Sequence, residues 1–390
     1  MTSTDYDTNG SLLIMTAGAN GAIGSTMAVA SLALGHRQHA ETVSAGLTTW
    51  GKFPRVADPA QTTIAGWDTN SGTIVDAIRG HGVLSDTQWR PHENGLSHIE
   101  IRTAPMESAP LAEQVDVIQA DIAHFKARHP HARPVMINLL PAARETGRTH
   151  GMASLEALLA TPHIELPDLA YVLAALLSDV PVVNFSPNVI ELPIICDEAA
   201  RRGLPLAGRD GKTGQTYFKV VLASAFKARS LNVDGWYSLN ILGNADGKNL
   251  MDPERARGKL QNKTNLLDDI LEYPVGRRYG ESSHKVHIDY YPPRGDAKEA
   301  WDVIDFTGIF GLPMSMRLNL QGRDSILAAP MAIDLACWTA ALHHAGIGGP
   351  IADLGFYFKK PVGERAPITF QAQLAALDRL AQRIQAHPPL

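Results

Sequence analysis

Short apolar runs alternate with helical patterns over the first half of the chain. The run SLLIMTAG at 11–18 ends in glycine, and the segment after it carries small and apolar residues at helical spacing. Further apolar runs bounded by turn residues lie at 62–68, 134–140 and 180–186, with helical patterns such as LAYVLAALLS between them. Strands that alternate with helices predict an α/β fold, in which helices cover a doubly wound parallel sheet.

The second half of the chain has a different pattern, starting at about residue 217. The segments 233–243, 284–293 and 314–322 alternate polar and apolar residues or carry β-branched and aromatic ones, as the half-buried strands of an open sheet do. We therefore expect a second domain of α+β type there. The segment 324–346 has an apolar helical face that ends at glycine, and it predicts a helix that returns the chain to the first domain.

The composition is that of a globular protein without general affinity for polyanions. Of the 390 residues, 45% are hydrophobic and 19% are charged, which provides enough apolar material for two domains. The 35 basic and 40 acidic side chains give a net charge of -5, so neither nucleic acid nor an anionic membrane is an expected partner. Any anionic ligand must be bound by a local group of cations.

The sequence gives no sign of a targeting segment, a disulfide or a zinc site. The N-terminal segment has no basic stretch followed by a long apolar one, and no run of 18 uncharged apolar residues occurs, so we expect a soluble cytoplasmic protein. Cys196 and Cys337 lie in apolar runs, which predict buried thiols rather than a disulfide or a metal site. The 15 histidines have no metal-site spacing, so no structural zinc is expected.

A glycine-rich turn connects the first predicted strand to the first predicted helix. The sequence G-A-N-G-A-I-G-S-T begins at Gly18 and has Asn20 where the usual dinucleotide motif has its second glycine. Glycine allows close approach of the backbone, and a helix N-terminus presents free N–H groups to a pyrophosphate. The same pattern also fits a strand-to-helix turn in a protein that binds no nucleotide. The candidate cofactor-binding residues are Gly18, Asn20, Gly21, Ala22 and Ile23.

Polar residues also follow two other predicted strands. In a parallel sheet the carboxyl ends of the strands meet at one edge, where ligands of such folds bind. Asp68 suits a ribose hydroxyl or the nicotinamide end of a dinucleotide, although an aspartate at this point also caps helices. The candidates at this edge are Asp68, Asn70, Ser71, Asn184 and Ser186.

Six motifs between residues 180 and 361 occur in the order found in inositol-phosphate synthases. They are N-F-S-P-N (184–188), G-R-D-G-K-T-G-Q-T (208–216), Y-S-L-N-I-L-G-N-A-D-G-K-N-L (237–250), G-D-A-K (295–298), R-D-S-I-L-A-A-P (323–330) and F-Y-F-K-K-P (356–361). The glycine turn and the segment G-W-D-T-N-S are also similar to those of this family. The chain therefore resembles the inositol-phosphate synthases over most of its length.

This resemblance implies an architecture, a cofactor and a reaction. It implies a Rossmann-type NAD-binding domain, residues 1–216 plus 328–390, with an inserted catalytic and tetramer-forming α+β domain at 217–327. NAD would be held tightly and restored in each turnover, and the protein would be a homotetramer acting on a hexose phosphate. The implied reaction converts glucose 6-phosphate to a myo-inositol phosphate by oxidation at carbon 5, enolisation, intramolecular aldol closure and re-reduction.

Such a reaction forms several oxyanions and needs several fixed cations. The lysines that match family motifs are Lys259, Lys263, Lys298 and Lys359. On a helix, Lys259 and Lys263 would share one face, and mutual repulsion would favour a neutral amine on one of them. The resemblance suggests that Lys298 and Lys359 support the hydride-transfer and enolate oxygens, while Lys259 and Lys263 hold the phosphate or the oxygen of carbon 1. The alternative for each lysine, retained for Lys360, is a solvated surface charge.

Carboxylates and amides accompany these lysines in the matching motifs. A carboxylate beside an ammonium orients it and tunes its proton affinity, although Asp296 and Asp324 also suit turns and helix caps. The resemblance places catalytic carboxylates at Asp210 and Asp296, and further cofactor-binding residues at Asp210, Asp324 and Ser325. It places substrate-binding residues at Asn240, Gly243, Asn244, Asp246, Lys259 and Lys263, where Asn244 and Asp246 also fit an ordinary turn.

Two departures from the family pattern leave other functions open. Arg209 stands where many relatives carry a second acid, and the stretch 137–143 lacks the polar residues expected after its strand. One alternative is a related cyclase that makes a different carbocycle, such as a five-membered cyclitol phosphate from fructose 6-phosphate. A simple NAD-dependent sugar-phosphate dehydrogenase or epimerase is a second, and an inactive sugar-phosphate-binding relative is a third.

Overall fold

The protein is described by a computed structural model that covers residues 10–36, 58–70, 72–143, 154–162, 166–251 and 266–386, apart from the side chains of Ala245 and Asp246. Two compact units divide the chain. The first unit contains Met1–Gly211, Ala328–Ala366 and Leu377–Leu390, and the second contains Lys212–Leu327 and Pro367–Ala376. Two helices, α13 (Asp324–His344) and α14 (Phe370–Ala386), contribute residues to both units.

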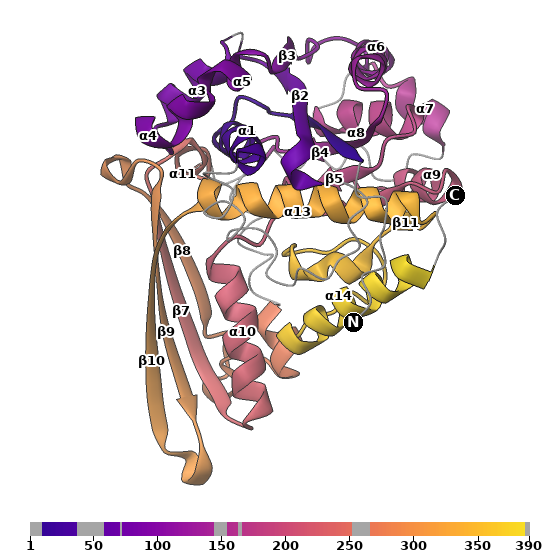
Figure 1. Cartoon of the computed structure of the whole chain (residues 1–390). Helices are drawn as coiled ribbons and strands as arrows, with labels where there is room; N and C mark the ends of the chain where they lie inside the picture. The colour runs from indigo at the N-terminus through magenta and orange to yellow at the C-terminus, as the bar shows by residue number, and fades with distance from the viewer. Residues whose placement is uncertain are drawn as a thin grey trace, which may run out of the picture. The chain divides into compact units, whose positions relative to one another are not determined.

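A seven-stranded parallel sheet forms the centre of the first unit (Figure 1). Its order, β11-β6-β5-β4-β1-β2-β3, contains the strand order of doubly wound dinucleotide-binding folds of the Rossmann type. The α/β fold expected from the sequence is therefore confirmed. The strands are β1 (Ser11–Ala17), β2 (Thr62–Asp68), β3 (Glu100–Thr103), β4 (Ala132–Asn138), β5 (Val182–Asn184), β6 (Pro205–Gly208) and β11 (Gly349–Pro350).

Helices cover both faces of this sheet because its strands are apolar on both sides. Leu12 and Ile14 of β1 belong to the core cluster that contains residues of α1 and α13. Leu13 and Met15 belong to the cluster that contains residues of α6, α8 and α9. Alternate side chains of one strand thus enter opposite layers. The helices of this unit are α1 (Ala22–Gly35), α3 (Ile74–His81), α4 (Asp86–Trp89), α5 (Glu93–Ser97), α6 (Leu111–Arg128), α7 (Leu155–Leu159), α8 (Asp168–Leu177) and α9 (Pro193–Arg201), with short 3-10 turns at Pro59–Gln61, Arg90–His92 and Ala352–Phe356.

The chain order of the sheet reverses at β1, which lies between β4 and β2. Ala17 is in register with Trp67 on one side and Asn138 on the other, and Asn138 is in register with Asn184. The strands therefore end at the same level. The crevice outside this carboxyl edge is the expected ligand position in such a fold.

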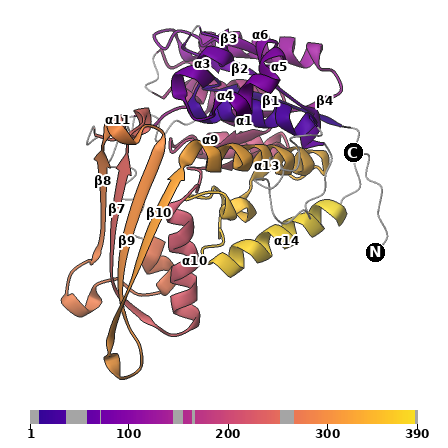
Figure 2. The ribbon, with the colours of Figure 1, turned by 60° about the vertical axis from the view of Figure 1, so that its left-hand side comes forward.

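A four-stranded sheet forms the second unit, with order β10-β9-β7-β8. Helix α10 (Gln215–Ala228) lies against it (Figure 2), and Val220 and Phe226 of α10 share a buried cluster with Trp236 and Ile304 of the sheet. The open α+β arrangement expected from the sequence is confirmed. The other elements are β7 (Asn232–Leu242), β8 (His284–Tyr290), β9 (Ala297–Thr307), β10 (Pro313–Arg323) and α11 (Ala245–Asn249), with 3-10 turns at Arg277–Tyr279, Pro292–Arg294 and Ile309–Gly311.

Helix α13 is the one described helix that is long and apolar enough to cross a membrane by composition alone. Its most apolar window is 78% buried inside the protein. Ala332, Leu335 and Ala336 on this helix are fully buried in the core of the first unit. Burial in the protein core accounts for its apolar character.

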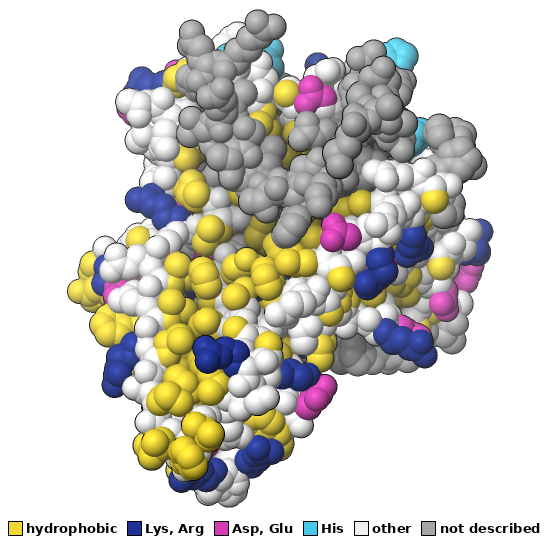
Figure 3. Space-filling model, turned by 60° about the horizontal axis from the view of Figure 1, so that its bottom comes forward, with side chains coloured by type: hydrophobic (Ala, Val, Ile, Leu, Met, Phe, Trp, Pro, Cys, Tyr) yellow, Lys and Arg dark blue, Asp and Glu magenta, His cyan; other side chains and the backbone are white. Residues whose placement is uncertain are grey.

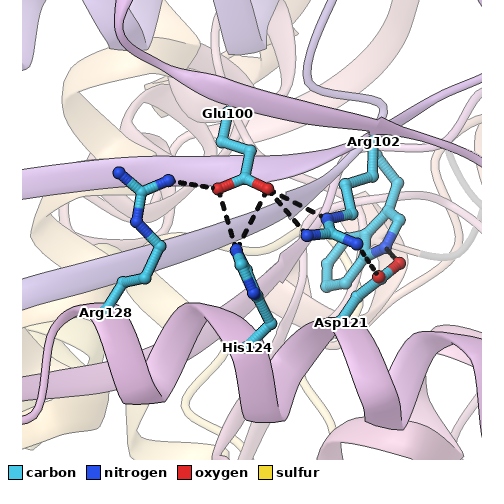
Figure 4. Close-up of polar contacts among 6 residues, drawn as sticks. Glu100, Arg102, Asp121, His124 and Arg128 are labelled. Carbon is cyan, nitrogen blue, oxygen red and sulfur yellow. Dashed lines mark hydrogen bonds and ion pairs between the residues drawn. The ribbon is translucent and has the colours of Figure 1, made fainter.

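A network of ion pairs connects edge strand β3 to helix α6 (Figure 4). Glu100 accepts hydrogen bonds from Arg102 at 2.9 Å, Arg128 at 2.7 Å and His124 at 3.3 Å. Arg102 also donates to Asp121 at 2.9 Å. Partial burial works to raise the pKa of Glu100, but these three donors outweigh it and hold the pKa below its usual value.

Candidate active site

The turn after β1 requires glycine at its first position. Gly18 has a φ of +83°, which side chains rarely tolerate, and a Cβ there would lie 3.3 Å from the carbonyl oxygen of Leu139. The N–H groups of Gly18 and Ala19 donate to the carbonyl oxygen of Trp67 at 2.9 and 3.0 Å. These bonds turn the chain sharply over the carboxyl end of β2.

Helix α1 begins directly after this turn without a side-chain cap. Its N-cap is Gly21, and no acidic residue lies in its first turn. A Cβ on Gly24 would lie 2.4 Å from the carbonyl oxygen of Ala19, so glycine is needed for the helix to start this close to the turn. The first N–H groups of a helix have no intrahelical acceptor, and together with the helix dipole they suit a phosphate. These residues thus lie together around a helix N-terminus that suits an anion: Gly18, Asn20, Gly21, Ala22 and Ile23.

Asn20 and Asp68 tie this turn to the loop after β2. The N–H of Asn20 donates to Asp68 at 2.9 Å, and the N–H of Asn70 donates to the other oxygen of Asp68 at 2.9 Å. The side-chain amide of Asn20 donates to the carbonyl oxygen of Gly72 at 2.9 Å. Thr73, rather than Asp68, caps the following helix α3. Asp68 therefore has a different structural role from the capping alternative.

The oxygen of the Asn20 side chain is a feature that points to a ligand. Asn20 is only 4% exposed, and its Oδ1 has no hydrogen-bond partner among the described residues. A buried acceptor without a donor is uncommon and calls for a partner. Together with the uncapped α1 and the crowded glycines, this fits a dinucleotide such as NAD. Ser71, also predicted to bind the cofactor, lies outside the described residues.

Asn184 and Ser186 belong to a buried polar network at the same edge. Asn184 accepts from the Asn138 side chain at 2.9 Å and donates to the carbonyl oxygen of Asn188 at 2.8 Å. The N–H of Asn188 donates to Ser186 at 3.2 Å. Asn184 is fully buried and Ser186 is 3% exposed. Their polar groups hold the loops that follow β4 and β5.

Asp168, which no sequence motif singled out, lies at the centre of this network. It is fully buried and accepts from Asn138 at 2.5 Å and from Asn188 at 2.9 Å. Burial raises the pKa of Asp168, and the hydrogen bonds from Asn138, Asn188 and Ser186 oppose that rise. In the sequence, an aspartate before LAYVLAALLS predicts only a first-turn helix acid. The asparagines at the ends of two adjacent strands were the signal that could have found it.

Lys359 and Asp210 form an ion pair in the first unit. The two groups are 2.7 Å apart, and their side chains are 22% and 8% exposed. Backbone bonds fix the pair, because the N–H of Lys359 donates to the carbonyl oxygen of Asp210 at 2.8 Å and the N–H of Asp210 donates to that of Ser186 at 2.9 Å. The chain thus holds a partly exposed ammonium near the ends of β5 and β6.

Lys298 and Asp324 form a similar ion pair in the second unit. Their charged groups are 3.2 Å apart, with side chains 16% and 28% exposed. Thr213 donates to the other oxygen of Asp324 at 3.0 Å, and Ser325 donates to Asp296 at 3.2 Å. Four predicted residues from two distant motifs therefore meet here. Thr213 was not predicted, since a threonine before glycine fits many ordinary turns.

The predicted substrate residues have mixed placements. Asn240 is 2% exposed and donates to Gln215 at 2.7 Å, so it supports the interior of the second unit. A Cβ on Gly243 would lie 2.4 Å from the N atom of Gly295, which requires glycine there. Asn244 accepts from the N–H of Gly247 at 3.0 Å, as in the turn alternative. Lys259, Lys263 and the side chain of Asp246 lie outside the described residues.

Two buried lysines of the second unit were not predicted. Lys212 donates to Gln373 at 2.8 Å, and burial lowers its pKa to about 7. Lys219 lies 2.8 Å from His284, and burial lowers its pKa to about 8 while Asp302 opposes the shift. Both are 2% exposed. The sequence suggested a neutral amine through repulsion between lysines, whereas burial produces the shift here.

Among the described residues, no group of three or more histidine, cysteine, aspartate or glutamate side chains is placed to hold a metal ion. Cys196 and Cys337 form no disulfide, and burial raises the pKa of Cys196 to about 11. The surroundings of Cys196 therefore do not activate it as a nucleophile.

A protein-family model and individual proteins of the same kind both match this chain. A family model described as myo-inositol-1-phosphate synthase matches residues 214–325. The inositol-3-phosphate synthase 1 of Bacteroides thetaiotaomicron is 38% identical over 299 residues, 74% of this chain and 67% of that protein. The inositol-3-phosphate synthase of Trypanosoma brucei brucei is 27% identical over 80% of this chain and 66% of its own length. The chain thus spans about two thirds of these relatives.

A solved structure has the same fold as this chain. The crystal structure of inositol-3-phosphate synthase from Caenorhabditis elegans matches 97% of this chain and 86% of its own, with a TM-score of 0.80 at 20% sequence identity. At this identity the likeness concerns the fold alone. It extends over both units of the chain.

Proposed function

We propose a reaction for this chain from one premise: it belongs to the inositol-3-phosphate synthase family. The proposed reaction is the NAD-dependent closure of glucose 6-phosphate to a myo-inositol phosphate. When bound, NAD would take a hydride at carbon 5 and later return it. The enzyme would then be an isomerase of the intramolecular lyase type, with no net change in cofactor.

The observation that carries this proposal is the presence of two ammonium–carboxylate pairs built from family motifs. Lys359 with Asp210 and Lys298 with Asp324 are each held within 3.2 Å. An ammonium fixed by a carboxylate can donate a short, charge-assisted hydrogen bond to a developing oxyanion. We assign Lys359 and Lys298 to the oxygen of carbon 5 and to the enolate, and we assign Asp296, which accepts a hydrogen bond from Ser325, to the catalytic carboxylates.

The other predicted residues are assigned to NAD and to the substrate. We assign the pyrophosphate of NAD to the start of α1 and its ribose to Asp68 and Asn70, with Ser71 beside them. Asn184 and Ser186 are assigned to shaping the edge beneath the nicotinamide end. Lys259, Lys263, Asn240, Gly243, Asn244 and Asp246 are assigned to the phosphate and the sugar hydroxyls.

We assign catalysis and self-association to residues 217–327, which lie within the second unit, and NAD binding to residues 1–216 plus 328–390. Hydrophobic side chains gather on one face of the molecule (Figure 3). Of the exposed large hydrophobic residues in the described part of the chain, all except Met106 and Val117 belong to the second unit. Trp301 and Tyr237 of its sheet are 49% and 46% exposed. Patches of this kind support an interface, and we propose a homotetramer.

One observation favours a second candidate, a cyclase acting on another hexose phosphate such as fructose 6-phosphate. Arg209, in the motif that also contains Asp210, pairs with Glu191 and is 9% exposed. The buried guanidinium of Arg209 adds N–H donors at this edge, and each of them needs an acceptor. The two candidates differ in substrate and ring size and share the oxidation and aldol steps.

Product identification distinguishes these functions. The full chain would be incubated with NAD and either glucose 6-phosphate or fructose 6-phosphate, while the product ring is identified by NMR and NADH is followed by absorbance. We expect a six-membered inositol phosphate from glucose 6-phosphate without NADH accumulation. A five-membered ring from fructose 6-phosphate would establish the second candidate, and stoichiometric NADH without a ring would indicate a dehydrogenase. An absence of any cyclised product would overturn the proposal.

A further inference from the structure

Arg209 directly follows β6 at the carboxyl edge of the parallel sheet. Gly208, the last residue of β6, is in register with Asn184 of β5. Three strand spacings separate β6 from β1, which at about 4.8 Å each is roughly 14 Å. A dinucleotide whose pyrophosphate lies at the start of α1 spans such a distance along the edge. Arg209 therefore lies on the side of the crevice suited to the reacting end and its substrate.

The hydrogen bonds of Arg209 are incomplete. Its backbone N–H donates to the carbonyl oxygen of Lys360 at 2.7 Å, and its Nη1 pairs with Glu191. Its Nε is buried and has no acceptor among the described residues, although the residue is nine-tenths buried. A buried N–H donor without an acceptor is unfavourable. Its acceptor is therefore expected from a ligand.

Arg202, in the same unit, has acceptors for both its Nε and its Nη1. Its Nε donates to Glu198 at 2.6 Å and its Nη1 donates to Asp179 at 2.9 Å. Both arginines pair with a glutamate, but only Arg209 keeps a buried donor unused. The unused, buried Nε–H is therefore a property of Arg209 and does not follow simply from an arginine pairing with a glutamate.

Charge decides what kind of acceptor fits. Glu191 already balances the guanidinium of Arg209, and Asp210 balances the nearby Lys359. A phosphate, which prefers uncompensated cations and two parallel donors, is a poor match for one N–H. A single hydroxyl or carbonyl oxygen of a sugar is a good match.

We propose that the Nε–H of Arg209 donates to one hydroxyl or carbonyl oxygen of the sugar phosphate, and that Arg209 thereby sets which hexose phosphate is accepted. This inference rests on the proposed function and names a specificity residue for it. A site that hydrogen-bonds one substrate oxygen discriminates strongly against sugars that lack it, because the buried donor is then left unpaired.

The test measures binding of glucose 6-phosphate and fructose 6-phosphate to the NAD-saturated full chain by calorimetry. Arg209→Lys keeps a cation for Glu191 but removes the Nε–H. We expect it to weaken the preferred sugar phosphate about tenfold or more, to reduce the ratio between the two sugars by a similar factor, and to leave the NAD affinity within about twofold. Arg202→Lys, the matched control, should leave the affinities for both sugars and NAD within about twofold.

A deoxy-sugar series locates the bond. One deoxy analogue of the preferred substrate should bind the wild type about tenfold more weakly than its parent, and Arg209→Lys should abolish that difference. If Arg209→Lys unfolds, the double variant Arg209→Gln with Glu191→Gln removes both charges and serves for the same comparison.

Unchanged sugar affinities in the Arg209 variants would overturn the inference, and so would an equal loss of NAD and sugar affinity, which would place the contact on the cofactor. Wild-type protein that binds neither hexose phosphate would overturn the inference and the proposed function together. Wild-type protein that binds a hexose phosphate but forms no ring would overturn the proposed function alone, and the Arg209 comparison would still be decided by binding.

Discussion

At the residue scale, the two proposed catalytic lysines owe their positions to single carboxylates. Asp324 accepts from both Lys298 and Thr213, so the carboxylate is held from two directions. Lys359 has Asp210 at 2.7 Å, and backbone bonds connect the two residues. Each ammonium is therefore pre-oriented before substrate arrives, which reduces the reorganisation needed when charge develops on the sugar.

Lys298→Ala should abolish turnover while leaving NAD bound. The change removes a fixed cation but no part of the glycine turn, so we expect kcat to fall by about 100-fold or more and the NAD dissociation constant to stay within about twofold. Product formation by NMR and NAD titration measure the two effects. Lys227→Ala, which removes an exposed ion pair with Glu272, is the matched control, and near-normal cyclisation by the Lys298 variant would defeat the assignment.

At the element scale, the strand ends and the start of α1 determine where chemistry can occur. The apolar runs at 11–18, 62–68, 134–140 and 180–186 predicted β1, β2, β4 and β5. The strands β3, β6 and β11 are two to four residues long and do not stand out as apolar runs, whereas the three-residue β5 lies within the longer apolar run 180–186. Burial likewise hid the role of Asp168, since its partners come from segments distant in sequence.

A carboxylate at the start of α1 should oppose NAD binding while slightly stabilising the protein without it. Ala22→Asp places a negative charge in an uncapped first turn, which is favourable by about 0.3–1 kcal/mol through the helix dipole. The same charge repels pyrophosphate, so we expect NAD affinity to fall about tenfold or more. Thermal unfolding with and without NAD measures both effects, with Ala22→Ser as the uncharged control. Wild-type NAD affinity in the aspartate variant would exclude this helix as the pyrophosphate site.

The Glu100 network should make stability depend on acid pH. The pKa of Glu100 is lower in the folded protein, so its contribution is present above its unfolded pKa and is lost as pH falls through the folded value. Glu100→Gln should reduce the free energy of unfolding by about 1 kcal/mol at pH 7 and should differ less from the wild type as pH falls below about 4. Denaturant unfolding across pH tests this against Glu113→Gln, which changes an exposed residue of α6. A difference independent of pH would show that charge is not the cause.

At the scale of the whole molecule, the sequence predicted both fold types because each has its own hydrophobic periodicity. Buried parallel strands give continuous apolar runs, while the half-exposed sheet of the second unit alternates. The candidate site was predicted less completely. Motifs identified Lys298, Asp324, Lys359 and Asp210, but Thr213 and the unused donor of Arg209 depend on contacts between segments that only the fold brings together.

The exposed face of the second unit predicts a change in oligomeric state. Trp301→Glu places a charge on a half-exposed apolar position of β9, and burial of that charge in an interface would be costly. If the wild type is the proposed tetramer, we expect light scattering to show a smaller species for this variant. Met106→Glu, at a 74% exposed position of the first unit, should leave the mass unchanged. A tetramer in the Trp301 variant would exclude this face as the interface.

In the proposed reaction, oxidation and reduction occur at the same carbon within one turnover. Glucose 6-phosphate carrying deuterium at carbon 5 tests it directly, with the full chain, catalytic NAD and NMR analysis of the product. We expect a cyclised product that retains the deuterium at the corresponding ring carbon, without accumulation of NADH. Product without that deuterium, or deuterium recovered in released NADH, would contradict it.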